Sequence, residues 1–248
     1  MPVTELDAAS IYGSSAQRAA RLIHLFKARF QSHERDHVNR LAQYVTGKGA
    51  IIDAGAHFGY FTKEFARLNA GRRKVHAFEP LPYNFGILHS VSSGLDNVSI
   101  YRQALSDANG SADLLVPVKA QGKIGPGLAH FGKERHRDYI RHRVETVTLD
   151  SFVRKAGITE VALIKIDVEG AELLVLRGAR EVLGKSGPAI YLELNAAFTE
   201  RLGYRPPDLF AMLNRYGYQS FLVKGRIDGL SRVYDYTVPG DYLFLRGA

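Results

Sequence analysis

The sequence predicts an α/β fold with a doubly wound, mostly parallel sheet of seven strands. Short apolar stretches alternate along the chain with segments of helical periodicity, the order that builds a parallel sheet covered by helices. The first apolar stretch runs directly into a turn that contains two glycines, Asp53–Gly59. With 248 residues, 46% of them hydrophobic, the chain can bury one substantial core.

A helical prefix, residues 1–48, is expected before the sheet. From Ser14 or Ser15, both suitable N-caps, to Val45 the apolar residues recur at helical spacing, and the polar residues 33–37 divide this stretch into two helices. We expect residues 49–248 to form the main domain.

Seven strands are expected in the main sheet, and most of them alternate with helices. The predicted strands are Ala50–Asp53, Lys74–Phe78, Asn97–Leu105, Val161–Ile166, Ala189–Leu194, Gln219–Val223 and Asp241–Arg246. The predicted helices are Phe58–Asn69, one that begins at Pro80, Ala171–Leu183 and Pro206–Tyr216.

The regular alternation breaks after the third strand. Two further stretches, Ser111–Val118 and Arg143–Leu149, predict a β-hairpin around the long segment Lys119–His142. This segment has six basic and two acidic residues, a net charge of +4. A segment of this length inside a compact domain is typical of a functional lid, although a solvated loop remains the alternative.

The composition limits the possible chemistry and compartment. The chain has a formal net charge of +8, which favours anionic partners or simply solubility, and no cysteine, which excludes disulfides and thiolate metal sites. Residues 1–7 contain acidic residues and no apolar run, so we expect no signal peptide. No stretch approaches the roughly 18 apolar residues of a membrane span. We expect a cytoplasmic protein.

Four of the predicted strands have polar residues or a glycine at their carboxyl ends. These residues are Asp53 and Gly55, Glu79, Asp167 and Glu169, and Glu193 and Asn195. In doubly wound sheets, ligands bind at the carboxyl ends of the strands, near the point where the strand order reverses. Glu79 follows Gly55 at close to the ~20-residue interval at which an acidic side chain accepts hydrogen bonds from ribose hydroxyls. The sequence therefore predicts a nucleoside site.

The glycine turn favours one kind of nucleoside over another. It has Gly55 and Gly59 but lacks the G-x-G spacing that admits a pyrophosphate, and Asp53 stands just before it. A carboxylate suits a ligand that carries an amino group and a sulfonium better than one that carries phosphates. S-adenosylmethionine is therefore favoured over NAD.

Taken together, these stretches resemble the FkbM family of S-adenosylmethionine-dependent methyltransferases. The resemblance covers about Ile51–Asn195 and rests on these stretches: Ile51–Thr62, Ala77–Pro80, Ala104–Asp107, Val147–Asp150 and Ile164–Glu172. It implies a Rossmann-like class I methyltransferase fold. It also implies O-methylation of hydroxyls of small molecules such as polyketides, sugars and glycolipids.

The resemblance also implies roles for residues of the cofactor site. Asp53, Gly55 and Gly59 would hold the methionine part, Glu79 the ribose, and Ser106 and Asp107 the adenine. We also count their neighbours Ala56, His57 and Pro80, together with Asp167, among the cofactor-binding residues.

A base near the expected methyl position would assist transfer to an alcohol, which must lose a proton. Asp167, Glu169 and Glu193 are expected to converge there and to raise one another's proton affinity. His57, which titrates near neutral pH when unperturbed, is the second candidate. Alternatively, Asp167, Glu193 and Asn195 would bind Mg²⁺, a possibility that we do not favour. Glu172 is expected at a helix surface or cap.

The acceptor is expected to be a small molecule or glycan. The basic lid adds the hypothesis that this acceptor is anionic or is presented at an anionic membrane. The basic balance leaves a nucleic-acid methyltransferase as the alternative. Against it, the fourth strand is followed by Asp167–Gly170 where amino-methylating enzymes have a Pro-Pro-aromatic motif. A non-enzymatic cofactor-binding module and a nicotinamide dehydrogenase are weaker alternatives. The sequence leaves the oligomeric state open.

Overall fold

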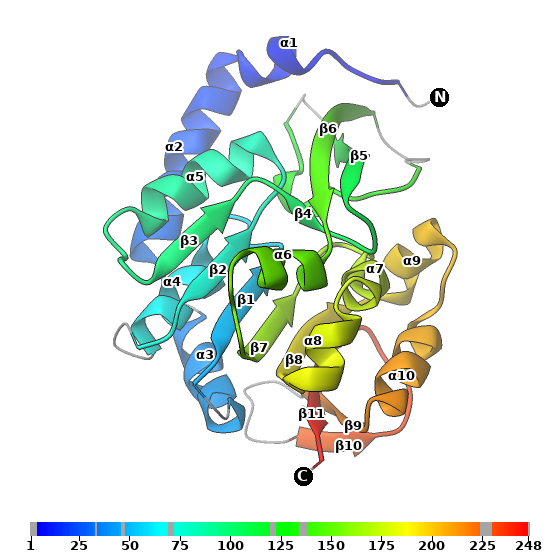
Figure 1. Cartoon of the computed structure of the whole chain (residues 1–248). Helices are drawn as coiled ribbons and strands as arrows, with labels where there is room; N and C mark the ends of the chain where they lie inside the picture. Colours follow the sequence, from blue (N-terminus) through cyan, green and yellow to red (C-terminus); the bar gives the residue numbers. More distant parts are fainter. Residues whose placement is uncertain are drawn as a thin grey trace.

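The computed structural model describes residues 4–32, 34–45, 48–68, 72–119, 123–133, 138–223 and 230–247. The described part contains one large sheet and one small sheet (Figure 1). In spatial order the large sheet consists of β10 (Leu230–Val233), β9 (Tyr218–Val223), β11 (Gly240–Arg246), β8 (Ala189–Leu194), β7 (Val161–Ile166), β1 (Ala50–Ala54), β2 (Val75–Phe78) and β3 (Val98–Tyr101).

The large sheet confirms the predicted doubly wound, mostly parallel arrangement. Strands β3, β2, β1, β7 and β8 pair in parallel, whereas β11 is antiparallel to both β8 and β9. The chain fills the sheet outward from β1 to β3 and then resumes at β7, so the strand order reverses between β1 and β7. Every residue of β7 is buried, as in strands covered on both faces.

The sheet has eight strands in the described residues, one more than predicted. The additional strand, β10, pairs antiparallel with β9 at the edge of the sheet. Its pattern is weak because it is short and includes the polar residues Ser231 and Arg232, and none of its residues is fully buried. Edge strands have only one pairing neighbour and need less apolar character.

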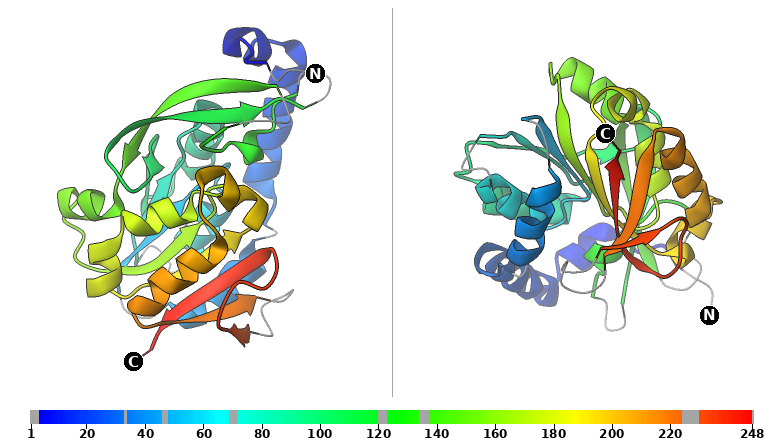
Figure 2. Two further views of the ribbon diagram at one scale, coloured as in Figure 1. Left: turned by 90° about the vertical axis from the view of Figure 1, so that its right-hand side faces the viewer. Right: turned by 90° about the horizontal axis from the view of Figure 1, so that it is seen from below.

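Helices cover both faces of the large sheet (Figures 1 and 2). One face is covered by α3 (Arg35–Leu41), α4 (Tyr60–Leu68) and α5 (Pro82–Ser92), and the other by α6 (Leu149–Lys155), α7 (Glu172–Arg177), α8 (Arg180–Lys185) and α10 (Pro206–Arg215). The short α9 (Ala196–Thr199) and η4 (Glu200–Leu202) follow β8.

Three helix boundaries differ from the prediction. Helix α5 begins at Pro82 rather than Pro80, α4 begins at Tyr60, and the single helix predicted over Ala171–Leu183 is two helices, α7 and α8. A break follows α7, where the backbone of Gly178 packs against Ser106.

The prefix contains the two predicted helices, α2 (Ser15–Phe30) and α3, followed by η1 (Ala42–Tyr44). The Ser14 side chain caps α2 by accepting a hydrogen bond from the Gln17 amide at 3.2 Å. A short α1 (Ala8–Tyr12) precedes them and was not predicted. Val38 and Leu41 of α3 join the core beneath the sheet. The domain boundary near residue 48 stays a prediction, and residue 33, the first of the predicted break 33–37, lies outside the described residues.

The small sheet lies beyond the carboxyl ends of the central strands (Figure 1). It contains β4 (Ala104–Leu105), β6 (Tyr139–Val147) and β5 (Gly110–Pro117), of which β5 and β6 form the predicted hairpin. The third predicted strand, residues 97–105, is thus divided between the two sheets.

The predicted lid is shorter than expected because β6 begins at Tyr139 and takes in its last residues. The described lid residues include η3 (Pro126–Leu128). The basic residues Arg135 and Arg137 lie outside the described residues. In the portion of the chain that the structure describes, no helix combines the length and the apolarity needed to cross a bilayer.

Candidate active site

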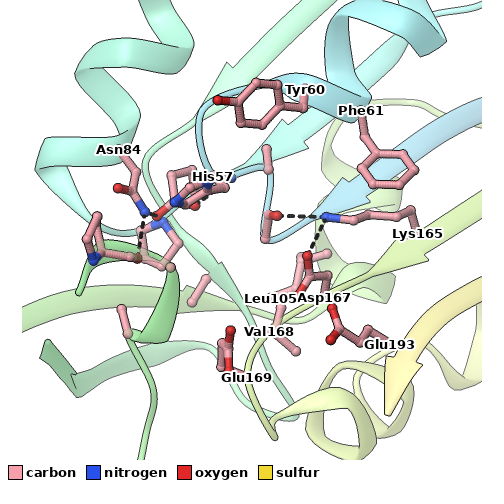
Figure 3. Close-up of a pocket in the computed structure, with 18 of the residues that line it drawn as sticks. His57, Tyr60, Phe61, Asn84, Leu105, Lys165, Asp167, Val168, Glu169 and Glu193 are labelled. Atoms are coloured by element: carbon pink, nitrogen blue, oxygen red, sulfur yellow. Dashed lines mark hydrogen bonds and ion pairs between the residues drawn. The ribbon is translucent and has the colours of Figure 1, made fainter. Parts of the chain in front are cut away.

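A cavity of about 300 Å³ opens at the carboxyl ends of β1, β2, β7 and β8, beneath the small sheet (Figure 3). Its volume is at the lower end of the ~300–1,000 Å³ usual for ligand sites. Eight of the residues singled out in the sequence line it: Gly55, Ala56, His57, Glu79, Pro80, Asp167, Glu169 and Glu193. Segments distant in sequence therefore meet at the expected edge of the sheet.

Glu79 is held in place by hydrogen bonds around its carboxylate. The His57 amide donates to Oε2 at 2.8 Å, and the Leu81 amide donates to Oε1 at 3.0 Å. The Asn84 side-chain amide donates to Oε1 at 3.3 Å. Burial raises the pKa of Glu79 to about 7, although these hydrogen bonds and the charge of Lys165 oppose the rise. The carboxylate is fixed before any ligand arrives.

Asn84 is a cavity residue that the sequence analysis did not single out. Its Nδ2 also donates to the Pro126 carbonyl at 3.2 Å, so it joins the Glu79 region to η3. Its Oδ1 is buried without a hydrogen-bond partner among the described residues. Only its position, five residues after Glu79 in the first turn of a helix, was available as a signal.

Asp53 lies behind the cavity and does not line it. Its Oδ2 accepts a hydrogen bond from Thr62 Oγ1 at 2.6 Å, and its Oδ1 forms an ion pair with Lys165 Nζ at 3.2 Å. The side chain is fully buried. In this geometry Asp53 joins β1 to α4 and β7, which determines the position of the glycine turn.

Lys165 also lines the cavity, and the sequence pattern did not single it out. Its ammonium group pairs with Asp53, lies 3.6 Å from Asp167 Oδ2 and donates to the Gly55 carbonyl at 2.8 Å. Burial alone would lower the pKa of Lys165, but the charges of Asp53 and Asp167 raise it overall. One charged residue inside an otherwise apolar strand was the signal in the sequence, because lysine is almost never buried without a partner.

Three carboxylates line the β7–β8 end of the cavity. Asp167 and Glu169 follow β7, and Glu193 is the one exposed position of β8. Burial, together with the charges of Asp167 and Glu193, raises the pKa of Glu169 to about 8. Although Glu193 is partly exposed, loss of solvent around its carboxyl and the charge of Asp167 raise its pKa to about 7. The pair can thus hold or release a proton close to neutral pH.

Glu169 is also constrained in its backbone. Its Oε2 is buried without a hydrogen-bond partner in the described structure, and its φ is 52°. Among the described residues, Glu169 and His57 are the only residues other than glycine that have a positive φ. Both line the cavity. Such strain concentrates at functional sites.

His57 differs from its expected behaviour. Burial, together with the charges of Lys165 and His24, lowers its pKa to about 3, so the imidazole is neutral at pH 7. Its ring stacks on Phe58 with 3.7 Å between ring centroids. Its Nε2 has no hydrogen-bond partner in the described structure. The geometry suits His57 as a hydrogen-bonding wall of the cavity and not as a group that titrates near neutrality.

Gly59, Ser106 and Asp107 do not line the cavity. Gly59 closes the turn with its amide bonded to the Ala56 carbonyl. The Ser106 amide donates to the Val147 carbonyl at 3.0 Å, and its hydroxyl donates to Asp107 at 3.3 Å. The preceding residues of the same stretch, Ala104 and Leu105, line the cavity instead.

Two further predictions concern a metal and a cap. Asn195 Oδ1 accepts a hydrogen bond from the Ala197 amide at 3.1 Å and so caps α9. No group of three His, Asp or Glu side chains suited to a metal occurs within the described ranges. Glu172 is the first residue of α7 and accepts a hydrogen bond from the Gly170 amide at 2.9 Å, but it is buried and does not lie at the surface.

The cavity fits S-adenosylmethionine by the chemistry of its wall. His57 Nε2, Asn84 Oδ1 and Glu169 Oε2 have no hydrogen-bond partner among the described residues. These atoms can therefore bind a polar ligand. Glu79 presents a fixed carboxylate, and carboxylates accept hydrogen bonds from vicinal hydroxyls. The closeness of Gly55 to the Asp167 carbonyl leaves no room for a side chain: an added Cβ would lie 1.8 Å from that oxygen.

Comparison with known proteins identifies the family. A model of the FkbM methyltransferase domain matches residues 53–220. The chain is 28% identical over 203 residues to methyltransferase sdnD of Sordaria araneosa, covering 71% of this chain and 75% of sdnD. It is 30% identical over 146 residues to 2-O-methyltransferase NoeI of Sinorhizobium fredii, covering 55% of this chain and 59% of NoeI.

A solved structure shows the same fold. Methyltransferase FkbM from Methylobacillus flagellatus superposes with a TM-score of 0.50 at 14% identity, covering 94% of this chain and 60% of the other. This chain therefore spans less than two thirds of both NoeI and the solved chain. The likeness confirms the Rossmann-like fold expected from the sequence.

Proposed function

Since the chain belongs to the FkbM family of methyltransferases, for which S-adenosylmethionine is the methyl donor, we propose that it methylates a hydroxyl of a small molecule, sugar or glycolipid. The observation that favours oxygen as the methylated atom is the presence of three carboxylates in the cavity wall: Asp167, Glu169 and Glu193. An alcohol loses a proton on methylation, so a nearby proton acceptor lowers the barrier. NoeI, a relative over part of the chain, is a 2-O-methyltransferase.

In this proposal the β1–β2 end of the cavity binds the donor. Glu79 accepts hydrogen bonds from the ribose hydroxyls of S-adenosylmethionine. Asn84 Oδ1 can accept a hydrogen bond from another N–H or O–H group of the same ligand. The neutral His57 ring and Gly55 form the wall next to them. When bound, S-adenosylmethionine supplies an electrophilic methyl group. The role of the protein is to align the acceptor oxygen with that group and to exclude water.

Glu169 is proposed as the proton acceptor at the β7–β8 end. Its Oε2 has no protein partner in the described residues, so it is free to accept the proton of the acceptor hydroxyl. The negative charges of Asp167 and Glu193 stabilise that proton on Glu169. Together with burial, these charges raise the pKa of Glu169. Lys165 neutralises part of the negative charge and holds Asp167.

The same carboxylates limit the acceptor. A phosphate or carboxylate next to the reacting hydroxyl would be repelled by Asp167, Glu169 and Glu193. We therefore propose that the part of the acceptor in the cavity is neutral or cationic. Any anionic part would lie outside, toward the basic lid residues Lys119 and Lys123.

The chemistry of the product tests this proposal. Purified protein is incubated with S-adenosylmethionine labelled in the methyl group and with sets of hydroxyl-bearing glycans, polyketides and glycolipids, and labelled products are analysed by mass spectrometry and NMR. We expect an O-methyl ether that survives mild alkali. Transfer only to nitrogen, or to nucleic acid in a salt-sensitive manner, would refute the proposal.

A further inference from the structure

Helix α2 exposes a row of large apolar side chains, here called the α2 stripe: Leu22, Ile23, Phe26 and Phe30, which are 69%, 55%, 66% and 65% exposed. They are four of the six large hydrophobic residues exposed in the described structure. The rings of the two phenylalanines pack against each other at 4.8 Å between centroids. Contiguous apolar patches on a protein surface mark interaction sites. The α2 stripe therefore calls for a partner.

The charges beside the α2 stripe define the chemistry of that partner. At ~100° per residue, the stripe occupies an arc of about 100° of the helix. Arg18 and Arg29 border it on one side and Lys27 on the other, and all three are exposed. Helix α2 has four basic residues and no acidic one. An apolar stripe between rows of cations is the pattern of helices that bind in the plane of a membrane surface.

The inner face of α2 is fixed to the rest of the protein. Gln17 and Ala28 are buried. At the C-terminal end, the buried ammonium group of Lys63 donates to the carbonyls of Ala28, at 2.7 Å, and Gln31. In all three views α2 is an outermost helix, packed beside α5 (Figures 1 and 2). The stripe is therefore held in a helical conformation before any partner binds, which reduces the entropic cost of docking.

Two partners could cover such a stripe, a second copy of the chain or an anionic bilayer. In a symmetric pairing of two α2 helices, both would present basic residues and no acidic residue to oppose them, and like charges across an interface are unfavourable. An anionic bilayer provides both an apolar layer and negative charge, and it attracts a chain of net charge +8 from a distance.

We propose that α2 docks the protein on an anionic lipid bilayer. The α2 stripe enters the boundary between headgroups and acyl chains, while Arg18, Lys27 and Arg29 extend to the lipid phosphates. Docking also orients the active site, because the His24 ring on the inner face of α2 lies 4.9 Å from the ring of Phe58, on which His57 stacks. The docking does not depend on the methyl acceptor.

Vesicle co-sedimentation of the full chain, without donor or acceptor, tests the proposal. We expect binding to vesicles of equal phosphatidylcholine and phosphatidylglycerol, weakening with salt, and little binding to phosphatidylcholine alone. The double variant Phe26→Ser/Phe30→Ser should bind at least about tenfold more weakly, because burial of two aromatic side chains is lost. Arg18→Glu/Lys27→Glu should also bind more weakly. Tyr234→Ser, which changes another exposed aromatic residue, is the matched control and should bind like the wild type.

Absence of binding to the anionic vesicles, or equal binding by the phenylalanine double variant, would overturn the proposal. So would a wild-type dimer that this variant converts to monomers without any vesicle binding, because the stripe would then join two copies of the chain. Circular dichroism and calorimetric binding of S-adenosylmethionine establish that each variant is folded. The changed side chains are exposed, so folding should be retained.

Discussion

The two ends of the cavity hold their carboxylates in opposite ways. At the β1–β2 end, Glu79 receives hydrogen bonds from two backbone amides and from Asn84. At the β7–β8 end, Glu169 has an oxygen without a partner in the described structure and lies beside Asp167 and Glu193, which repel its charge. One carboxylate is fixed as an acceptor of hydrogen bonds, and the other is prepared to take up a proton. In the proposed function, this difference separates donor binding at Glu79 from proton transfer at Glu169 within one cavity.

The largest effect is expected from the substitution Glu169→Gln. It keeps the shape of the side chain and removes the proton acceptor, so kcat should fall by about 10²–10⁴-fold, while donor affinity stays unchanged. Steady-state kinetics and calorimetry measure the two quantities separately. Glu181→Gln, at an exposed position of α8, is the control. If kcat of Glu169→Gln stays close to the wild-type value, the proton-accepting role belongs to another residue.

The second effect concerns the ion pair behind the cavity. Lys165→Met leaves the Asp53 charge buried without its partner, which should lower the free energy of unfolding by about 3–5 kcal/mol. Urea denaturation measures this change. Lys185→Met removes an exposed pairing with Glu181 and should change stability by less than about 0.5 kcal/mol. If the two variants lower the free energy of unfolding equally, the buried ion pair between Lys165 and Asp53 does not contribute the expected stability.

The third effect is on binding of the donor. Glu79→Ala removes the acceptor proposed for the ribose hydroxyls, and hydrogen bonds to charged groups contribute about 1.5–3 kcal/mol each, so affinity should fall by about 10²-fold or more. Calorimetry with S-adenosylmethionine checks this, and circular dichroism verifies folding. Glu145→Ala, at an exposed position of β6, should bind normally. Unchanged affinity of Glu79→Ala would place the ribose elsewhere.

The smallest effect is a displacement of the pH profile. Glu169 must be deprotonated to accept a proton, and its pKa is about 8, so kcat should decrease as the pH falls through about 8. Because the charge of Glu193 contributes to that raised pKa, Glu193→Gln should lower it and move the acidic limb to lower pH. Activity measured across the pH range tests this. A limb that does not move would mean that the two carboxylates act independently.

The sequence predicted the architecture and the carboxylate-bearing part of the cavity wall because both follow from local patterns. The strand ends at Asp53, Glu79, Asp167 and Glu193 could be recognised from apolar stretches that stop at an acidic residue. Parallel strands then bring these ends to one edge of the sheet. The split of the third strand and the edge strand β10 were missed because pairing partners decide them, and these lie far away in the chain.

The direction of each side chain was not predictable from the same patterns. Asp53 and Glu79 both end a strand, yet Asp53 turns to Thr62 and Lys165 behind the cavity, whereas Glu79 lines it. The difference arises from a lysine more than a hundred residues away in sequence. Similarly, the unperturbed pKa of histidine suggested a group that titrates near pH 7, and only the burial of His57 beside Lys165 reverses that expectation.

The upper wall of the cavity comes from one continuous stretch of chain, since β4, β5, η3 and the hairpin to β6 all lie within residues 104–147. Glu79, proposed to bind the ribose of the donor, and Glu169, proposed to take the proton, come from other segments. A wall of this kind can diverge among relatives by substitution or insertion while the strand ends stay as they are. We therefore expect that exchange of this stretch between family members would transfer acceptor preference while the strand ends stay unaltered.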